Sequence, residues 1–294
     1  MTSKTNFDEK KTAIVTGAGG LLGGCMTEQL AKSNWRVIAL THADLDITDE
    51  TNVRRIIEQE KPDVVINCAA TTDVDRCERD IEWAFAVNQK GPRYLARACR
   101  DVHAEFVHIS TDYVFDGTKP GFYTQEDSPN PLSVYGKSKL AGEQAVSQEL
   151  PESLIIRTSW VFGVGGKNFG SKLFDYARAG AKLKGVQDQT SIATYAPDLA
   201  ARIEELMALR HHGLYHVTNT GAMSWLEFAR LAFELAGMRD FAIEPCTRAD
   251  LNQLALRPHN SAMRCLLSES LGLKPLRSWQ AALKDFVRNY FHQP

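Results

Sequence analysis

The feature that most constrains how this chain can fold is an alternation of short apolar runs with longer amphipathic stretches through its first half. The apolar runs predict β-strands at 12–17, 35–40, 63–70, 105–110 and 153–160. The stretches between them have helical spacing, at 20–32, 50–60, 82–100 and 134–149. Strands that alternate with helices over short connections form parallel sheets covered on both faces. We therefore predict an α/β fold with a doubly wound parallel sheet, which binds ligands at the carboxyl ends of its strands.

Beyond residue 160 the alternation loosens, which indicates a second, smaller C-terminal lobe. Helices are expected at 168–180, 196–209, 224–236 and 278–290, and short strands near 182–187, 213–217 and 241–245. We predict a sheet domain made of 11–160 and about 195–220, and a lobe made of about 161–194 and 221–294. Residues 1–10 are polar and are expected to form a loose arm.

A glycine-rich loop follows the first predicted strand and opens the first helix. It reads "TGAGGLLGG", with glycines at Gly17, Gly20 and Gly23, while Leu22 stands where a strict G-x-G-x-x-G motif would have its last glycine. Glycines at this place let the backbone approach a pyrophosphate, which the helix N-terminus stabilises. The alternative is a glycine-rich turn that binds no ligand.

The end of the second predicted strand leaves the choice between NAD and NADP open. An acid there would bind the ribose 2′-hydroxyl of NAD, and an arginine would accommodate a 2′-phosphate. Thr41 and His42 occupy this position instead, and Asp46 follows later, where we expect it at the adenine edge. His42 is expected to be a solvated loop histidine.

A tyrosine and a lysine stand four residues apart in "VYGKSKLAGE", on one face of a predicted helix. The preceding strand ends in "HISTDYVFDG", which brings Thr111 and Tyr113 to the same edge of the sheet as Tyr135 and Lys139. A free phenol has a pKa of about 10, and a nearby ammonium favours its ionised form. Tyr135 could then give a proton to an alkoxide as hydride reaches a carbonyl carbon. The alternative is a chance spacing, because a tyrosine and a lysine four apart are common.

The motifs together resemble those of the dTDP-4-dehydrorhamnose reductase family, which are extended short-chain dehydrogenase/reductases. The resemblance runs in order from about residue 12 to 290, and its strongest parts are "STDYVFDG", "YGKSKLAGE" and "RTSWVFG". It implies a Rossmann-like dinucleotide-binding domain, a substrate-binding lobe and NADPH or NADH as cofactor. The implied reaction carries hydride to C4 of a dTDP-4-keto-6-deoxy sugar, which gives dTDP-L-rhamnose from dTDP-4-dehydro-L-rhamnose.

The resemblance also implies roles for individual positions. The implied catalytic residues are Thr111, Tyr135 and Lys139. The implied cofactor-binding residues are Gly17, Gly20, Leu21, Leu22, Asp46, Ile47, Ala69, Ala70, Thr72, Tyr135 and Lys139. The implied substrate-binding residues are Val74, Thr111, Tyr113 and Trp160, and we add Arg257 as a candidate for the substrate diphosphate.

Some of these positions have a structural alternative. Arg257 could form an ion pair, Trp160 could be a core aromatic rather than a cleft wall, and Asn168 could cap a helix rather than bond substrate. No metal is predicted, because acids of the kind that bind Mg2+ at a dimer interface in some family members have no match here.

One loop departs from the family pattern, which usually has a glycine and a proline in DQxGxPT. Here it reads "DQTSIAT", with Ser191 and Ala193 at those two places. Since glycine and proline fix backbone shape, the loop is expected to run differently and to leave the exact sugar less certain than the chemistry. The first alternative function is therefore another nucleotide-sugar 4-ketoreductase. The second is a non-catalytic NADP-binding regulatory subunit, because the methionine adenosyltransferase beta subunit resembles the same family.

Composition excludes several other classes of function. The formal net charge is −2 without a basic run, so no nucleic acid partner is expected. No apolar run approaches 18 residues, so no membrane span is expected. The six cysteines form no CxxC pair and indicate a reducing, cytoplasmic setting. The expected partner is a nucleotide-sugar substrate, and a homodimer is compatible with the resemblance.

Overall fold

The computed structural model describes residues 10–165 and 168–291. The expected N-terminal arm, apart from Lys10, lies outside these residues. Within the described part of the chain, no helix is long and apolar enough to cross a membrane.

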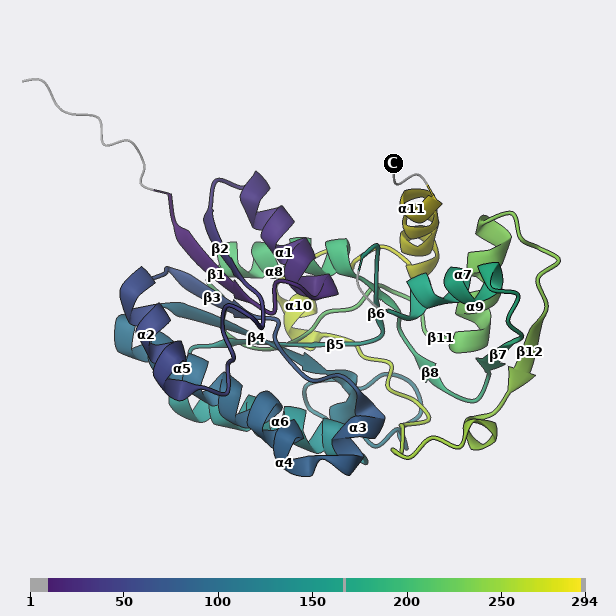
Figure 1. Cartoon of the computed structure of the whole chain (residues 1–294), viewed down its shortest axis with the longest axis horizontal. Helices are drawn as coiled ribbons and strands as arrows, with labels where there is room; N and C mark the ends of the chain where they lie inside the picture. The colour runs from purple at the N-terminus through teal and green to yellow at the C-terminus, as the bar shows by residue number, and fades with distance from the viewer. Residues whose placement is uncertain (1–9, 166–167, 292–294) are drawn as a thin grey trace, which may run out of the picture.

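A six-stranded sheet forms the centre of the larger domain (Figure 1), in the order β10-β5-β4-β3-β1-β2. Every neighbouring pair is parallel, which confirms the predicted α/β class. The strands are β1 (Thr12–Thr16), β2 (Arg36–Leu40), β3 (Val64–Asn67), β4 (Glu105–Thr111), β5 (Leu154–Thr158) and β10 (Gly213–His216). The strand order changes direction between β1 and β3, and such a switch point opens a crevice at the carboxyl ends.

Helices cover both faces of the sheet (Figure 1). On one face, α1 (Leu21–Lys32) packs beside α8 (Ala196–Ala208), and their buried side chains share a core with β1 and β3. On the other face lie α2 (Glu50–Glu60), α5 (Gly91–Val102) and α6 (Val134–Glu149). This double covering explains why all five residues of β1 are buried.

The helix expected at 82–100 is interrupted. It consists of α4 (Ile81–Phe85), a π-helical turn η1 (Ala86–Lys90) and α5, and a short helix α3 (Val74–Arg79) precedes it. The turn places the buried Asn88 so that its amide bonds both backbone groups of Thr71, at 3.0 and 3.1 Å, and the Ser138 hydroxyl at 3.0 Å. A π-turn within a helix often marks a functional position. Here it ties the loop after β3 to the helix that carries Tyr135 and Lys139.

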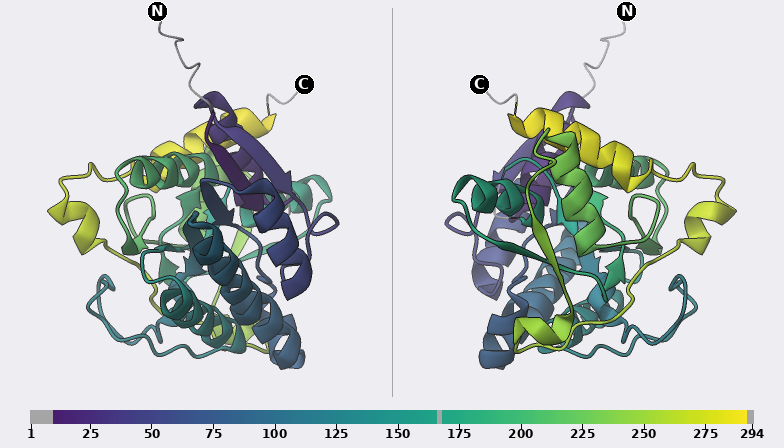
Figure 2. Two further views of the ribbon diagram at one scale, coloured as in Figure 1. Left: turned by 90° about the vertical axis from the view of Figure 1, so that its left-hand side faces the viewer. Right: turned by 90° about the vertical axis from the view of Figure 1, so that its right-hand side faces the viewer.

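The C-terminal lobe is built on an aromatic core. The helices around this core are α7 (Phe169–Arg178), α9 (Trp225–Leu235) and α11 (Trp279–Phe291). A further short helix, α10 (Leu266–Ser270), lies beside the sheet core instead, since Cys265 and Leu273 at its two ends pack against that core. Its short strands are β6 (Val161–Phe162), β7 (Leu183–Val186), β8 (Thr190–Ser191), β9 (Thr194–Tyr195), β11 (Met223–Ser224) and β12 (Ile243–Cys246). Two 3-10 turns complete the elements, η2 (Asp112–Val114) and η3 (Arg248–Leu251). Figure 2 shows α11, in yellow, against the green α9, where Phe286, Phe228 and Phe162 pack together.

The predicted long elements of the second half correspond to α7, α8, α9, α11, β7, β10 and β12 to within a few residues. The two-residue strands and α10 were not predicted, since such short pieces carry no periodic signal. β10, which lies in the segment 195–220, joins the edge of the central sheet beside β5. The division into two domains with the boundaries given above stays a prediction.

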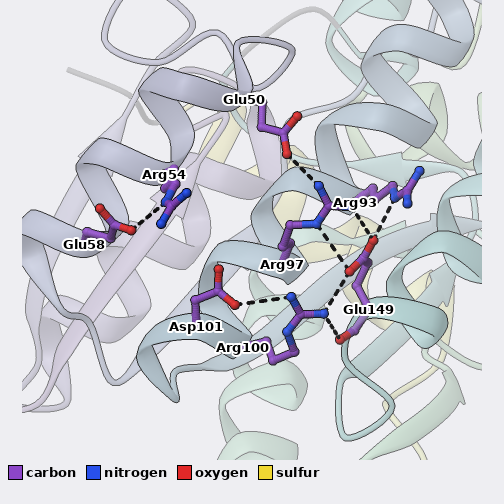
Figure 3. A network of polar contacts seen from close by, with 8 residues as sticks. All are labelled: Glu50, Arg54, Glu58, Arg93, Arg97, Arg100, Asp101 and Glu149. Carbon is purple, nitrogen blue, oxygen red and sulfur yellow. Dashed lines mark hydrogen bonds and ion pairs between the residues drawn. The ribbon is translucent and has the colours of Figure 1, made fainter.

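The outer surface of α2, α5 and α6 carries a charge network (Figure 3). Arg93, Arg97 and Arg100 all reach the Glu149 carboxylate, at 2.8 to 2.9 Å. Hydrogen bonds from Arg97 come first among the causes that lower the pKa of Glu149 to about 2. Glu50, Asp101 and the Arg54–Glu58 pair complete the network and balance its charge, four arginines against four acids. The arginine row is therefore an internally neutralised surface rather than a polyanion-binding stripe.

Candidate active site

The sequence-predicted residues of the glycine loop and of "STDY" meet at the carboxyl edge of the sheet, as the strand order requires. The loop follows β1, Ala69 to Thr72 follow β3, and Thr111 ends β4. Tyr135 and Lys139 lie on the first two turns of α6, whose N-terminus is capped by the Ser133 hydroxyl.

Steric contact explains the glycines of the first loop. Gly17 has φ +66°, and a Cβ atom there would lie 2.6 Å from the Ala69 nitrogen. A Cβ on Gly23 would lie 2.2 Å from the Gly17 carbonyl oxygen. Real side chains do not approach backbone atoms so closely, so these two positions require glycine. The loop is thereby held flat against the chain that leaves β3.

The start of α1 fits a diphosphate. Its N-cap is Gly20, no side chain caps the first turn, and no acid lies within that turn. The free N–H groups and the positive end of the helix dipole suit an anion. Leu22 packs its side chain into the core, so that only its backbone could face a ligand. The cofactor-binding roles of Gly17, Gly20, Leu21 and Leu22 stay predictions that this geometry supports.

The expected adenosine end lies at the turn after β2. Asp46 is exposed, and its carboxylate accepts hydrogen bonds from the Thr48 backbone at 2.9 Å and hydroxyl at 2.8 Å. Ile47 is buried, and its side chain fills the space that a Cβ on Gly91 would take. Thr41 turns its N–H and hydroxyl toward Asp44, at 2.9 and 2.6 Å. Ala69 is half-buried, whereas Ala70 and Thr72 are exposed beyond the end of β3.

Tyr135 is buried, and the Thr111 hydroxyl lies beside its phenol oxygen. Burial raises the pKa of Tyr135 well above its ordinary value, and the Thr111 hydroxyl, which can donate to the ionised phenolate, opposes this only in part. Lys139 donates to the Ile109 carbonyl at 2.5 Å, and burial lowers the pKa of Lys139 to about 8. The prediction that Lys139 lowers the pKa of Tyr135 is therefore wrong, since the pKa of Tyr135 is raised. The ammonium is bound to a backbone carbonyl, and burial dominates at the phenol.

Asp112 is a residue that the sequence reasoning missed. Its side chain is buried and accepts hydrogen bonds from Thr111 Oγ1 at 3.1 Å, Ser191 Oγ at 3.2 Å and Ser261 Oγ at 2.5 Å. Burial raises the pKa of Asp112 to about 6, and the three hydroxyl groups lower it. The sequence could have pointed to Asp112, because the acid directly follows the candidate Thr111 in the "STD" motif.

The predicted substrate side contains an aromatic pair and an ion pair. Tyr113 packs edge-on against Tyr135, with ring centroids 5.6 Å apart, and the half-buried Val74 packs in the same cluster. Burial raises the pKa of Tyr113 to about 12, and the positive charge of Arg257 opposes this in part. Arg257 therefore lies beside Tyr113, and it also pairs with Asp75 at 3.3 Å. The ion-pair alternative for Arg257 is thus present, next to the predicted sugar site.

Trp160 adopts a left-handed backbone conformation, with φ +42°. Its ring stacks on Trp225 with centroids 3.7 Å apart, and its indole nitrogen is buried without a hydrogen-bond partner among the described residues. Unfavourable backbone conformations in non-glycine residues cluster at ligand sites. The assignment of Trp160 to the cleft wall stays a prediction.

Other candidates have structural roles. Asn168 caps α7 through Ser171 and also bonds the Gly163 carbonyl at 2.9 Å. Ser110 donates to Glu143 at 2.5 Å, and Glu143 forms a buried ion pair with Arg157 at 2.7 Å. A serine held in this way is not free to act as a nucleophile. The remaining missed residues, such as Asn88 and Asp75, act across long sequence separations that no local motif reveals.

Comparisons with known proteins agree with this geometry. The family model described as the RmlD substrate binding domain matches residues 11–291. A dTDP-4-dehydrorhamnose reductase of Mycobacterium tuberculosis is 42% identical, over 92% of this chain and 90% of that protein. A dTDP-4-keto-6-deoxy-D-glucose reductase of Streptomyces niveus is 37% identical, over 92% of this chain and 94% of that protein. The crystal structure of dTDP-4-dehydrorhamnose reductase from Bacillus anthracis in complex with NADP has a TM-score of 0.93 and 34% identity, and the match covers 96% of this chain and 100% of that one.

Proposed function

We propose that this chain, which belongs to the dTDP-4-dehydrorhamnose reductase family by a model that matches residues 11–291, reduces the 4-keto group of a dTDP-4-keto-6-deoxy sugar with NADPH or NADH. The substrate that we propose first is dTDP-4-dehydro-L-rhamnose, and the product is then dTDP-L-rhamnose. One observation carries the proposal. The buried Tyr135 phenol lies beside the buried Thr111 hydroxyl at the edge of the sheet that the glycine loop shares, with Lys139 one helical turn away.

The bound nicotinamide would supply the hydride. The protein supplies a proton and a fixed geometry. Because burial raises its pKa, the Tyr135 hydroxyl stays protonated at neutral pH and can give its proton to the C4 oxygen. Thr111 holds that hydroxyl in place, and Tyr113 beside it would face the sugar. Lys139, with a pKa of about 8, keeps a large charged fraction near neutral pH and would hold the nicotinamide ribose.

Absorbance at 340 nm tests this proposal, with purified protein, enzymatically generated dTDP-4-dehydro-L-rhamnose, and NADPH or NADH in parallel. Oxidation of either cofactor that depends on the sugar nucleotide supports it, and the ratio of the two rates gives the cofactor preference. Cofactor binding without any turnover would contradict it and favour a non-catalytic regulatory subunit.

A second candidate is the reduction of a different 4-keto-6-deoxy sugar by the same residues. The observation that favours it is the loop at 188–194, where Ser191 bonds Asp112 beside Thr111. The relative from Streptomyces niveus carries a different sugar in its name, at similar identity. Assays with dTDP-4-dehydro-L-rhamnose and with dTDP-4-keto-6-deoxy-D-glucose separate the candidates. Turnover of the D-glucose-derived compound alone would exclude the rhamnose reaction.

We further propose that the protein works in the reducing cytoplasm as a homodimer. All six cysteines are free thiols, and burial raises the pKa of Cys68 to about 12 and that of Cys25 to about 11. Such thiols are poorly reactive and suit a reducing compartment. Light scattering coupled to gel filtration measures the oligomeric state, and a mass equal to one chain would contradict the dimer.

A further inference from the structure

Asp112 directly follows Thr111 in the chain and accepts a hydrogen bond from its hydroxyl, yet none of the roles assigned so far uses it. Its side chain is 2% exposed, and Ser191 and Ser261, which are both fully buried, bond to its Oδ2 atom. Ser191 lies in the loop that departs from its family, at the place where the resemblance puts glycine. The chain has therefore added a hydroxyl group at a position that touches Asp112.

The two serines come from segments that are joined by backbone hydrogen bonds. The Ser261 nitrogen donates to the Thr190 carbonyl at 2.9 Å, and the Thr190 nitrogen donates to the His259 carbonyl at 2.7 Å. β8, which contains Ser191, also pairs with β11. The position of Ser191 is thus fixed by the backbone on both sides, and its hydroxyl lies 2.9 Å from that of Ser261. Its single proton goes to the carboxylate directly or through Ser261.

The hydroxyl protons of the site can be counted. An ionised carboxylate only accepts hydrogen bonds, while each hydroxyl group has one proton to give. Asp112 Oδ1 takes the proton of Thr111. With its proton on Asp112, Thr111 Oγ1 is left as an acceptor: it takes the Tyr113 N–H at 3.2 Å and has a second lone pair for the neutral phenol of Tyr135 beside it. An ionised Asp112 therefore decides the orientation of the proton that we propose Tyr135 transfers.

We propose that Ser191 is a positioning residue which, together with Ser261, holds the Asp112 carboxylate so that Asp112 orients Thr111 and, through it, the Tyr135 hydroxyl. This inference rests on the proposed reductase function. A protonated Asp112 would donate to Thr111 and compete with Tyr135 for the same oxygen, so the ionised form is the active one.

The charged and titratable groups that face Asp112 are Tyr113 and Tyr135, and Arg257 lies beside Tyr113. Burial raises the pKa of Asp112 to about 6, and the hydrogen bond from Ser191 is among the effects that lower it. Ser191→Gly restores the family residue and removes one donor to the ionised form. It should therefore raise the pKa of Asp112, by about one pH unit for a hydrogen bond to a charged group.

The test compares wild type with Ser191→Gly, Ser191→Ala and Asp112→Asn. In the pH profile of kcat/KM, the acid limb should move up by about one unit in both Ser191 variants and disappear in Asp112→Asn. Ser159→Ala is the matched control, because the buried Ser159 donates to the Ile192 carbonyl of the same loop at 2.6 Å without touching Asp112. It should lower the melting temperature and leave the acid limb in place.

A second readout does not depend on turnover. Protein labelled with 13C at the aspartate side-chain carboxyls reports the Asp112 titration, assigned by the signal that Asp112→Asn removes. An upward shift of the Asp112 pKa in Ser191→Gly supports the role of Ser191 even if the protein does not reduce the keto sugar. Absence of reduction would overturn only the proposed reductase function. An unchanged Asp112 titration, or an acid limb that moves equally in Ser159→Ala, would overturn the role of Ser191.

Discussion

Arg257 and Asp75 lie 182 positions apart in the chain, yet Nη1 and Nη2 of Arg257 each donate to an oxygen of the Asp75 carboxylate at 3.3 Å. Asp75 also accepts a hydrogen bond from the Ala255 nitrogen at 2.9 Å. Asp75, in α3, therefore holds the segment 255–257 against that helix. As a result, the side chain of Arg257 lies near the hydroxyl group of Tyr113.

This pair leads to the first prediction. If Arg257 also holds the substrate diphosphate, Arg257→Lys should raise KM for the nucleotide sugar about tenfold and leave kcat nearly unchanged, because lysine lacks the fork that binds two oxygens. Asp75→Asn should keep KM within about twofold, since Arg257 remains. Steady-state kinetics on both variants checks this. A purely structural pair would lower the melting temperature in both variants and leave KM alone.

Tyr135→Phe should lower kcat by about 10² to 10⁴, because the proposed proton donor is lost. The dissociation constant of NADPH should stay close to that of wild type, as measured by fluorescence titration. Tyr123→Phe is the control, because it also removes a phenol hydroxyl. The Tyr123 hydroxyl donates to Asp116 at 2.8 Å, and neither residue belongs to the proposed catalytic set. A Tyr135→Phe enzyme with normal kcat would remove Tyr135 from the reaction.

Two adjacent glycines of α1 should respond in opposite ways to alanine. Gly23→Ala puts a methyl group 2.2 Å from the Gly17 carbonyl, so it should distort the loop, destabilise the protein by about 1–3 kcal/mol and weaken NADPH binding. Gly24→Ala meets its nearest atom at 3.7 Å and should be neutral or stabilise the helix by about 0.5–1 kcal/mol. Thermal unfolding with and without NADPH distinguishes the two. Equal effects would refute the steric explanation.

Glu149 makes the stability of the outer helices depend on pH. Its folded-state pKa of about 2 is below its ordinary 4.5, so its contribution is complete above pH 4.5 and is lost as pH falls toward 2. Urea unfolding should show that wild type loses more stability than Glu149→Gln over this window. The variant should already be less stable at neutral pH, since the Arg93, Arg97 and Arg100 guanidinium groups lose their shared partner. Parallel pH curves for the two proteins would show that another carboxyl group dominates.

Local patterns of the sequence predicted most of the scaffold. The alternation of apolar runs and helices was sufficient for the parallel sheet, because burial on both faces leaves a direct mark on each strand. The glycine loop, Thr111, Tyr135 and Lys139 could be placed at one edge for the same reason, since parallel strands all end there. Family membership followed from motifs in a fixed order, and the comparisons confirm it.

Only the tertiary structure decided what surrounds those residues. Lys139 was expected to act on Tyr135 but bonds the Ile109 carbonyl, and burial sets the direction of the Tyr135 pKa. Asp112 receives hydroxyl groups from residues 79 and 149 positions away, and no local pattern encodes such contacts. Periodicity and motifs record which face of an element is buried. Hydrogen bonds between distant segments depend on how those elements pack, and packing exists only in the folded chain.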